Sequence, residues 1–246
     1  MKTCAPSSHG PLLKLPSLQR AEFLKRLNRF VGTARIQGRQ QKIHIADPGR
    51  LNELLYTGNT IMVKPAPKDS SRKTAWSLMA ARGENGWVLL NTFLHRRIAE
   101  NILRDPEISP FGELKSFRAE VTPEGFKSRF DFLLKPKSSA PVWLEVKGCT
   151  LLKGKTALFP DAPTTRGTRH MLELKELSGR GEGAAVMFLV FPQGAECFAA
   201  NGDTDPDFHE AFGNAQDSGV EVFPLRLDFD GERVLFQRKL PVLRTH

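Results

Sequence analysis

The sequence has little cysteine and no long hydrophobic run. Its three cysteines, Cys4, Cys149 and Cys197, form no CxxC pair, which argues against a disulfide framework or a zinc knuckle. The longest apolar run covers residues 184–191 and is far shorter than the roughly 18 residues of a membrane span. The first residues have no signal-peptide-like apolar segment. We therefore expect a cytoplasmic protein with no membrane partner.

Several catalytic motifs are also missing. No P-loop, dinucleotide-binding GxGxxG or GxSxG element occurs in the sequence, so nucleotide-dependent and serine-hydrolase activities have no support. A catalytic role for Cys149 and a role as a small, partly buried thiol both fit its position, and the second interpretation is favoured.

Positive charge is concentrated in the first third of the chain. Residues 1–90 hold 15 Lys or Arg and 5 Asp or Glu, a difference of +10, whereas residues 91–246 hold 21 and 22, a difference of −1. This asymmetry predicts a polyanion-binding module followed by a nearly neutral one. A basic surface without a partner is the alternative.

The basic part is expected to be a small β-barrel. Residues 1–17 are proline-rich and predict a flexible or extended lead-in. Residues 18–90 alternate short β-prone runs with turn signals, with a short helix expected at 50–55. This pattern is typical of an OB-like barrel, which often binds oligonucleotides.

Nucleic-acid contacts in the barrel are expected from its cations, and the best candidates are Arg29, Arg50, Arg72 and Lys73. Phe30 and Trp76 are candidate stacking residues, although both lie in apolar runs, so a core position is favoured. His44 fits either the binding surface or a hydrogen-bonded position within the barrel.

Residues 91–246 predict an α/β domain. A helix is expected at 91–103, where Phe93 belongs to the apolar pattern and Asn91 or Thr92 is the cap. Further strands and helices follow, and Pro224 should confine the last strand to an edge or a bulge. The segment 148–165 is expected to be a lid-like loop, in which Asp161 is either a ligand or a turn residue.

The stretch 128–147 carries the candidate site. It predicts two strands, the first with Asp131 and the second with Glu145 and Lys147. Because side chains alternate along a strand, Glu145 and Lys147 share a face, and an antiparallel neighbour places Asp131 beside Glu145. Two close carboxylates are stabilised by a divalent cation, so Asp131 and Glu145 are the predicted metal ligands and Lys147 would orient or activate a water.

This D…ExK pattern resembles the PD-(D/E)xK nuclease superfamily, whose core is a mixed sheet flanked by helices. The resemblance implies Mg²⁺ or Mn²⁺ bound by the two acids. Glu120, on the preceding strand, is either a third catalytic acid or a salt-bridged glutamate. Arg166 and His170 share a helical face and either meet the nucleic acid or form a surface cluster.

Several separate blocks resemble the sugar fermentation stimulation protein A (SfsA) family over residues 18–242. The blocks are LNRF at 27–30, HIADPGRL at 44–51, NT at 91–92, EV at 120–121, SRFD at 128–131, EVK at 145–147, FPDA at 159–162 and RGTRH at 166–170. The resemblance implies an N-terminal OB-like domain (18–90), a C-terminal nuclease-like domain (91–246), DNA binding and regulation of sugar utilisation genes. Asp47 stands where many members have Asn.

Three functions remain open from the sequence. The leading hypothesis is an SfsA-type DNA-binding protein with a metal-dependent phosphodiester-hydrolysing site. The first alternative is a non-enzymatic DNA-binding regulator with a vestigial site, and the second is an OB-type module for an oligosaccharide or another ligand. A homodimer is compatible with each, since nucleases that cut both strands are often dimers.

Overall fold

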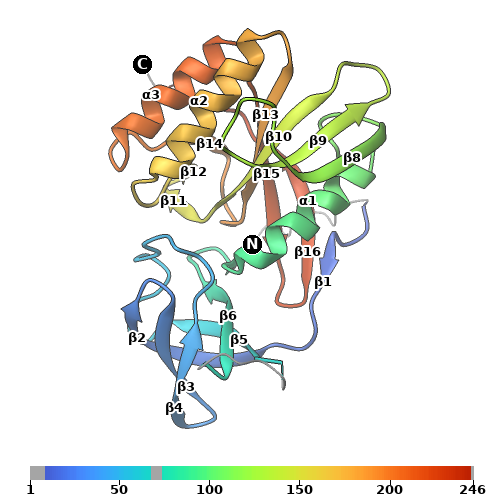
Figure 1. Cartoon of the computed structure of the whole chain (residues 1–246). Helices are drawn as coiled ribbons and strands as arrows, with labels where there is room; N and C mark the ends of the chain where they lie inside the picture. The colour runs from blue at the N-terminus through green and yellow to red at the C-terminus, as the bar shows by residue number, and fades with distance from the viewer. Residues whose placement is uncertain (1–8, 68–73, 245–246) are drawn as a thin grey trace.

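The computed structural model describes residues 9–67 and 74–244, which form two lobes (Figure 1). Five strands build the lower lobe: β2 (Gln19–Asn28), β3 (Val31–Ile36), β4 (Arg39–His44), β5 (Thr60–Pro65) and β6 (Trp76–Arg82). Their order is β4-β3-β2-β5-β6, and β4 also pairs with β6, which closes the barrel. The prediction of a β-barrel in this segment is therefore confirmed.

The barrel is held by alternating apolar side chains that point inward. Phe23, Ile36, Ile43 and Ile61 are each no more than 1% exposed, as the two-residue period of a half-buried strand requires. Of the one or two helical turns expected at 50–55, a single hydrogen-bonded turn is present, in which the amides of Leu54 and Leu55 both donate to the Leu51 carbonyl. No regular helix is formed in this segment.

The upper lobe is a mixed sheet covered on two faces. Its strands are β7 (Trp87–Leu89), β8 (Leu114–Val121), β9 (Phe130–Pro136), β10 (Val142–Cys149), β13 (Gly183–Val190), β15 (Glu221–Phe229) and β16 (Arg233–Lys239). They run in the order β7-β15-β13-β10-β9-β8, with β16 beside β15. The pairs β10–β13 and β13–β15 are parallel and the others are antiparallel.

Helices cover this sheet as the sequence predicts. Helix α1 (His95–Arg104) follows the 3₁₀ turn η1 (Thr92–Leu94) and packs in the core shared with the barrel. Helices α2 (Thr165–Gly179) and α3 (Pro206–Asp217) lie side by side over the opposite face (Figure 1). Side chains of Thr164 and Asp205 cap α2 and α3 by accepting from amides of the first turns.

Strand β15, which contains Pro224, is interior, between β13 and β16. Its ladder with β16 begins only at Leu225 and is interrupted by a bulge between Arg226 and Leu227, so of the expected edge or bulge the strand has the bulge. One expectation about the upper lobe was wrong. The segment 148–165 is not a bare loop, because it contains a hairpin of β11 (Leu151–Lys153) and β12 (Thr156–Phe159), and β12 pairs with β14 (Cys197–Ala200).

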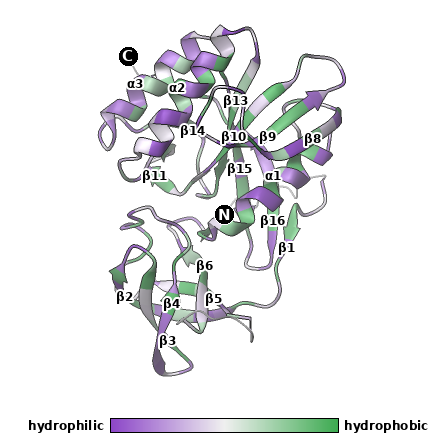
Figure 2. Cartoon of the chain, viewed as in Figure 1, coloured by the Kyte–Doolittle hydropathy of each residue, from purple (hydrophilic) through white to green (hydrophobic). Residues whose placement is uncertain are grey.

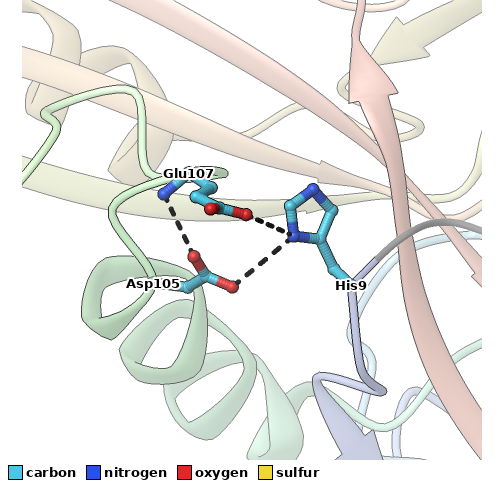
Figure 3. Close-up of side chains that lie close together, drawn as sticks. All are labelled: His9, Asp105 and Glu107. Atoms are coloured by element: carbon cyan, nitrogen blue, oxygen red, sulfur yellow. Dashed lines mark hydrogen bonds and ion pairs between the residues drawn. The ribbon is translucent and has the colours of Figure 1, made fainter.

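The described part of the lead-in is ordered against the upper lobe. Strand β1 (Leu13–Lys14) pairs with β16, and Leu12 and Leu13 are buried. Figure 3 shows His9 Nδ1 between two carboxylates that follow α1, at 3.8 Å from Asp105 and 3.5 Å from Glu107. Of the two expectations for the lead-in, flexible or extended, the extended one describes residues 13–14.

Hydropathy follows these layers. Strand β13 is hydrophobic along its length, whereas the exposed faces of α1, α2 and α3 are largely hydrophilic (Figure 2). Within residues 9–67 and 74–244, no helix is both long enough and apolar enough to cross a membrane.

Candidate active site

Three acids form a row across β8, β9 and β10. Phe132 pairs with both Ala119 and Leu144, and continuing these two antiparallel registers by one residue places Asp131 between Glu120 and Glu145. The regular β9–β10 ladder stops at this point, because the Asp131 carboxylate accepts from the Val146 amide at 2.7 Å. The predicted neighbourhood of Asp131 and Glu145 is thus present where the two strands separate.

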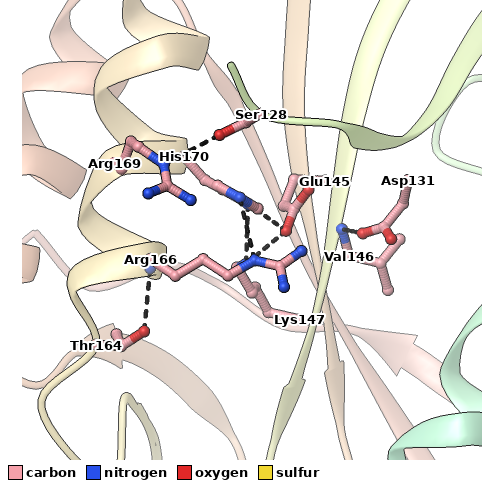
Figure 4. A network of polar contacts seen from close by, with 10 residues as sticks. Ser128, Asp131, Glu145, Val146, Lys147, Thr164, Arg166, Arg169 and His170 are labelled. Atoms are coloured by element: carbon pink, nitrogen blue, oxygen red, sulfur yellow. Dashed lines mark hydrogen bonds and ion pairs between the residues drawn. The ribbon is translucent and has the colours of Figure 1, made fainter. Parts of the chain in front are cut away.

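Glu145 is the centre of a buried polar network (Figure 4). Its Oε1 atom accepts from Lys147 Nζ and His170 Nδ1, each at 2.5 Å, and its side chain is 4% exposed. Its second oxygen, Oε2, is buried and has no hydrogen-bond partner among the described residues. One carboxylate oxygen is therefore satisfied by the protein while the other remains available to a ligand.

The tautomer of His170 follows from its two neighbours. Arg166 Nε donates to His170 Nε2 at 3.4 Å, so Nε2 is an acceptor and the proton lies on Nδ1. His170 then donates that proton to Glu145. The His170 side chain is 1% exposed. It fixes the Glu145 carboxylate by a hydrogen bond and does not reach the protein surface, although we predicted that it contacts nucleic acid.

The two carboxyl groups have opposite pKa shifts. Burial, reinforced by the charge of Glu145, raises the pKa of Asp131 to about 7. Burial also acts to raise the pKa of Glu145, but the charge of Lys147 and the hydrogen bond from His170 outweigh it and lower that pKa to about 2. Near neutral pH, Glu145 is ionised and Asp131 is poised between its two protonation states.

These features fit a divalent cation. A buried carboxylate oxygen without a partner and a neighbouring carboxyl that resists ionisation both gain from a positive charge placed between them. Carboxylate oxygens are hard ligands of the kind that Mg²⁺ and Mn²⁺ prefer. Glu145 and Asp131 are the residues that would hold such an ion.

Glu120 is paired with arginine on the side of the row away from Glu145. Its carboxylate lies 2.6 Å from Arg129 and 4.0 Å from Arg96, and its charge raises the pKa of Asp131. Its φ of +57° is in the left-handed region, which is strained for a residue with a Cβ. The salt-bridged interpretation describes this structure, and a contribution to catalysis stays a prediction.

A cleft of about 540 Å³ opens beside this network, between the two lobes. Three cations line it, namely Arg29 from the barrel, Lys147 from β10 and Arg166 from α2. Two predicted nucleic-acid contacts, Arg29 and Arg166, therefore share one cleft with Lys147. Arg50 is exposed and does not line the cleft, while Arg72 and Lys73 lie outside the described residues.

Asp161 joins the lobes along one side of the cleft. Its Oδ2 accepts from the Leu51 amide at 3.1 Å, and a Cβ on Gly49 would lie 2.3 Å from that oxygen, so only glycine fits there. Nearby Asp47 accepts from the Gly49 amide at 2.8 Å. Burial raises the pKa of Asp47 to about 6, although the bond from Gly49 opposes the shift.

Other side chains differ from their predicted positions. Phe30 is 48% exposed, so the core position favoured for it was wrong. Phe93, which belongs to the apolar pattern of the predicted helix, is 72% exposed. Trp76 is half-buried and donates to Gln41 at 3.1 Å. Cys149 is buried, which raises the pKa of its thiol well above the usual range and supports the favoured interpretation of a buried thiol.

Two residues in or near the site were not found from the sequence. His95 lines the cleft, its Nε2 is buried without a partner among the described residues, and burial lowers its pKa to about 4. A Cβ on Gly148 would lie 2.2 Å from its ring. Arg169 donates to Ser128 at 3.2 Å and ties α2 to the start of β9. Neither role has a local sequence signal, because each depends on a segment distant in the chain.

Comparison with known proteins matches both lobes to one family. Residues 24–90 match the SfsA N-terminal OB domain, and residues 93–233 match the sugar fermentation stimulation protein RE domain. The sugar fermentation stimulation protein homolog of Methanococcoides burtonii is 42% identical over 239 residues, covering 94% of each chain. That of Methanothermobacter thermautotrophicus is 40% identical and covers 88% of this chain and 89% of its own.

A solved structure agrees with these relationships. The structure of Pyrococcus furiosus SfsA in complex with Ca²⁺ superimposes with a TM-score of 0.83 at 28% identity, covering 96% of this chain and all of the other. The two relatives are matched over 94% and 89% of their own lengths, so the similarity extends over both lobes of this chain. The chain belongs to the sugar fermentation stimulation protein (SfsA) family.

Proposed function

We propose that this protein is a nucleic-acid-binding, metal-dependent phosphodiesterase with a nuclease-like site of the PD-(D/E)xK type. The observation that carries the proposal is the Asp131–Glu145–Lys147 group, in which a buried carboxylate oxygen lacks a partner. A helix, three antiparallel strands, a crossover helix and a parallel strand surround that group. This order supports the predicted nuclease-like core.

Each residue has a role that follows from its contacts. Glu145 and Asp131 would hold Mg²⁺ or Mn²⁺, which supplies a bound water of lowered pKa and stabilises charge on the phosphate. Lys147 keeps its ammonium at Glu145, where it can orient a water or a phosphate oxygen. His170 fixes Glu145, and Arg166 fixes the tautomer of His170. The Ca²⁺ named for the Pyrococcus furiosus structure supports a cation site in the family.

Nucleic acid is the proposed partner because cations of both lobes face the cleft. Arg29 and Arg166 lie along it beside Lys147, and the first 90 residues carry the excess positive charge. Such a surface attracts the phosphate backbone and makes binding dependent on salt.

The test uses the intact protein with single-stranded, duplex and branched DNA, with Mg²⁺ or Mn²⁺ and with EDTA. We expect metal-dependent cleavage that falls by about 10²-fold or more in Asp131→Asn, as for other losses of transition-state charge stabilisation, while binding in EDTA is kept. The matched control is Asp203→Asn, an exposed acid outside the site, which should cut normally. Absence of cleavage with any substrate, or equal cleavage by both variants, contradicts the proposal.

A non-enzymatic DNA-binding regulator is the second candidate. The observation in its favour is that Lys147 already neutralises Glu145 and His170 donates a hydrogen bond to it, without a divalent cation. It predicts salt-dependent DNA binding in the wild type and in Asp131→Asn, with no metal bound in a calorimetric titration and no cleavage.

A further inference from the structure

Three aromatic side chains at the seam between the lobes have no role in the proposed chemistry. We name Phe30, His44 and Phe93 the aromatic rim. Phe93 is 72% exposed and Phe30 is 48% exposed, the first being the most exposed large hydrophobic residue of the described chain. Exposing such rings forgoes the stabilisation that burial of apolar surface would give, and no core contact explains their position.

The rim spans both lobes. Phe30 and His44 lie at adjoining ends of β3 and β4, where the Ile45 amide donates to the Phe30 carbonyl at 2.8 Å and His44 pairs with Val31. Phe93 comes from η1, at the start of the upper lobe. Its ring is stacked on His44 with centroids 6.2 Å apart and an interplanar angle of 21°. The stack therefore bridges the barrel and the nuclease-like lobe.

The rim is continuous with the cleft and with positive charge. Arg29 precedes Phe30, lines the cleft and holds its guanidinium carbon 5.8 Å from the centre of the Phe30 ring. Thr92, which precedes Phe93, also lines the cleft and donates to the Ala46 carbonyl at 3.1 Å. Aromatic faces interleaved with arginine form the surface on which unpaired bases stack while their phosphates are neutralised.

We propose that the aromatic rim binds the unpaired bases of single-stranded nucleic acid and leads the strand into the cleft toward Lys147. The inference rests on the proposed function and adds the substrate class, because bases within a duplex are stacked on one another and offer no free face. Phe30 and Phe93 supply the stacking surfaces, and His44 supports the ring of Phe93. Arg29 contacts the phosphate backbone of the bound strand.

The experiment measures binding alone, by fluorescence anisotropy in EDTA, with labelled oligo-dT, oligo-rU and a DNA duplex of equal length. We expect Phe93→Ala and Phe30→Ala each to weaken oligo-dT binding about tenfold and duplex binding by less than about twofold. The salt dependence of log K should keep its slope in these variants, whereas Arg29→Ala should reduce the slope by about 0.7. Comparison of the affinities for oligo-dT and oligo-rU shows whether the preferred single strand is DNA or RNA.

The matched control is Tyr56→Ala, which removes another aromatic ring, 54% exposed, that has no ring contact with the rim among the described residues. Thermal unfolding confirms that each variant is folded. The inference is overturned if the rim variants bind oligo-dT like the Tyr56 control, or if they lose duplex and single-strand binding equally. Those outcomes leave the proposed function standing, whereas a wild type that binds none of the three probes at low salt contradicts both.

Discussion

Two pairs of acids flank the cleft, and they are built differently. At the seam between the lobes, Asp161 accepts from Leu51 and packs on Gly49, while Asp47 accepts from the Gly49 amide. The second pair, which we call the edge pair, is Asp131 and Glu145, at the point where β9 and β10 separate. Asp131 accepts from one amide. Glu145 has one oxygen bound by two side chains and one oxygen without a partner among the described residues.

The difference shows that proximity of two acids does not define a metal site. The seam pair is used to hold one backbone segment against another, so its charge has a structural purpose. The edge pair combines opposite pKa shifts with an unused buried oxygen, and this combination is what a cation would satisfy. Substitutions in or beside either pair test this difference.

The largest effect is expected from Lys147→Met. It leaves the buried Glu145 charge with His170 alone, and removing one partner of a buried ion pair destabilises by about 3–5 kcal/mol. Urea unfolding at pH 7 with EDTA measures this free energy. The matched control is Lys155→Met, which breaks an exposed pair with Glu196 and should change stability little. Equal effects of the two variants would show that Lys147 does not balance Glu145.

A smaller effect, with a pH signature, is expected from Asp131→Asn. The folded pKa of Asp131 is about 7, above the ordinary 3.8, so the carboxyl ionises first in the unfolded chain. The contribution of Asp131 to the free energy of unfolding is fully present below about pH 4 and is lost as the pH rises through about 7. In EDTA the variant should therefore be more stable than the wild type by about 2–4 kcal/mol at pH 8.

That difference should disappear near pH 4 and shrink at pH 8 when Mg²⁺ is added to the wild type. Glu145 does not contribute to this pH dependence. Its pKa is lowered to about 2, so its effect on the free energy of unfolding changes only as the pH falls below about 4.5. A variant with the same pH dependence as the wild type between pH 4 and 8 would remove the distinction between the two acid pairs.

The smallest effect is expected at the seam. Asp161→Ala removes the acceptor of the Leu51 amide but relieves repulsion with Asp47, so we expect a loss of about 1 kcal/mol in unfolding free energy. Gly49→Ala should destabilise the wild type more than it destabilises Asp161→Ala, because its Cβ meets the Asp161 carboxylate. A double-mutant cycle by urea unfolding tests this coupling, and strictly additive effects would contradict the seam contact.

Local patterns were enough to predict much of this molecule. The apolar strand pattern of 142–146 and the apolar run at 184–191 predicted β10 and β13, and the polar residues 203–205 predicted the start of α3. The spacing of Asp131 and Glu145 on strands predicted their neighbourhood. Each of these signals depends on residues close together in the chain.

Features set by distant contacts were missed. The interior position of the strand that contains Pro224 depends on its pairing with β16, which is distant from β13 in the chain. Phe30 and Phe93 have apolar sequence neighbours, and their exposure depends on how the two lobes meet. His170 has the spacing of a surface cluster with Arg166, yet α2 packs it against Glu145. No local period encodes such partners.

The pairing of β1 with β16 has a consequence for how the chain is made. Residues 12–15 are fixed by backbone bonds to residues 232–234, so β1 gains its strand partner only after β16 has been synthesised. The barrel lies between β1 and η1, and is thus fastened to the upper lobe at both its entry and its exit. The barrel can fold before β16 is made, but its attachment to the other lobe through β1 is completed only once β16 is present.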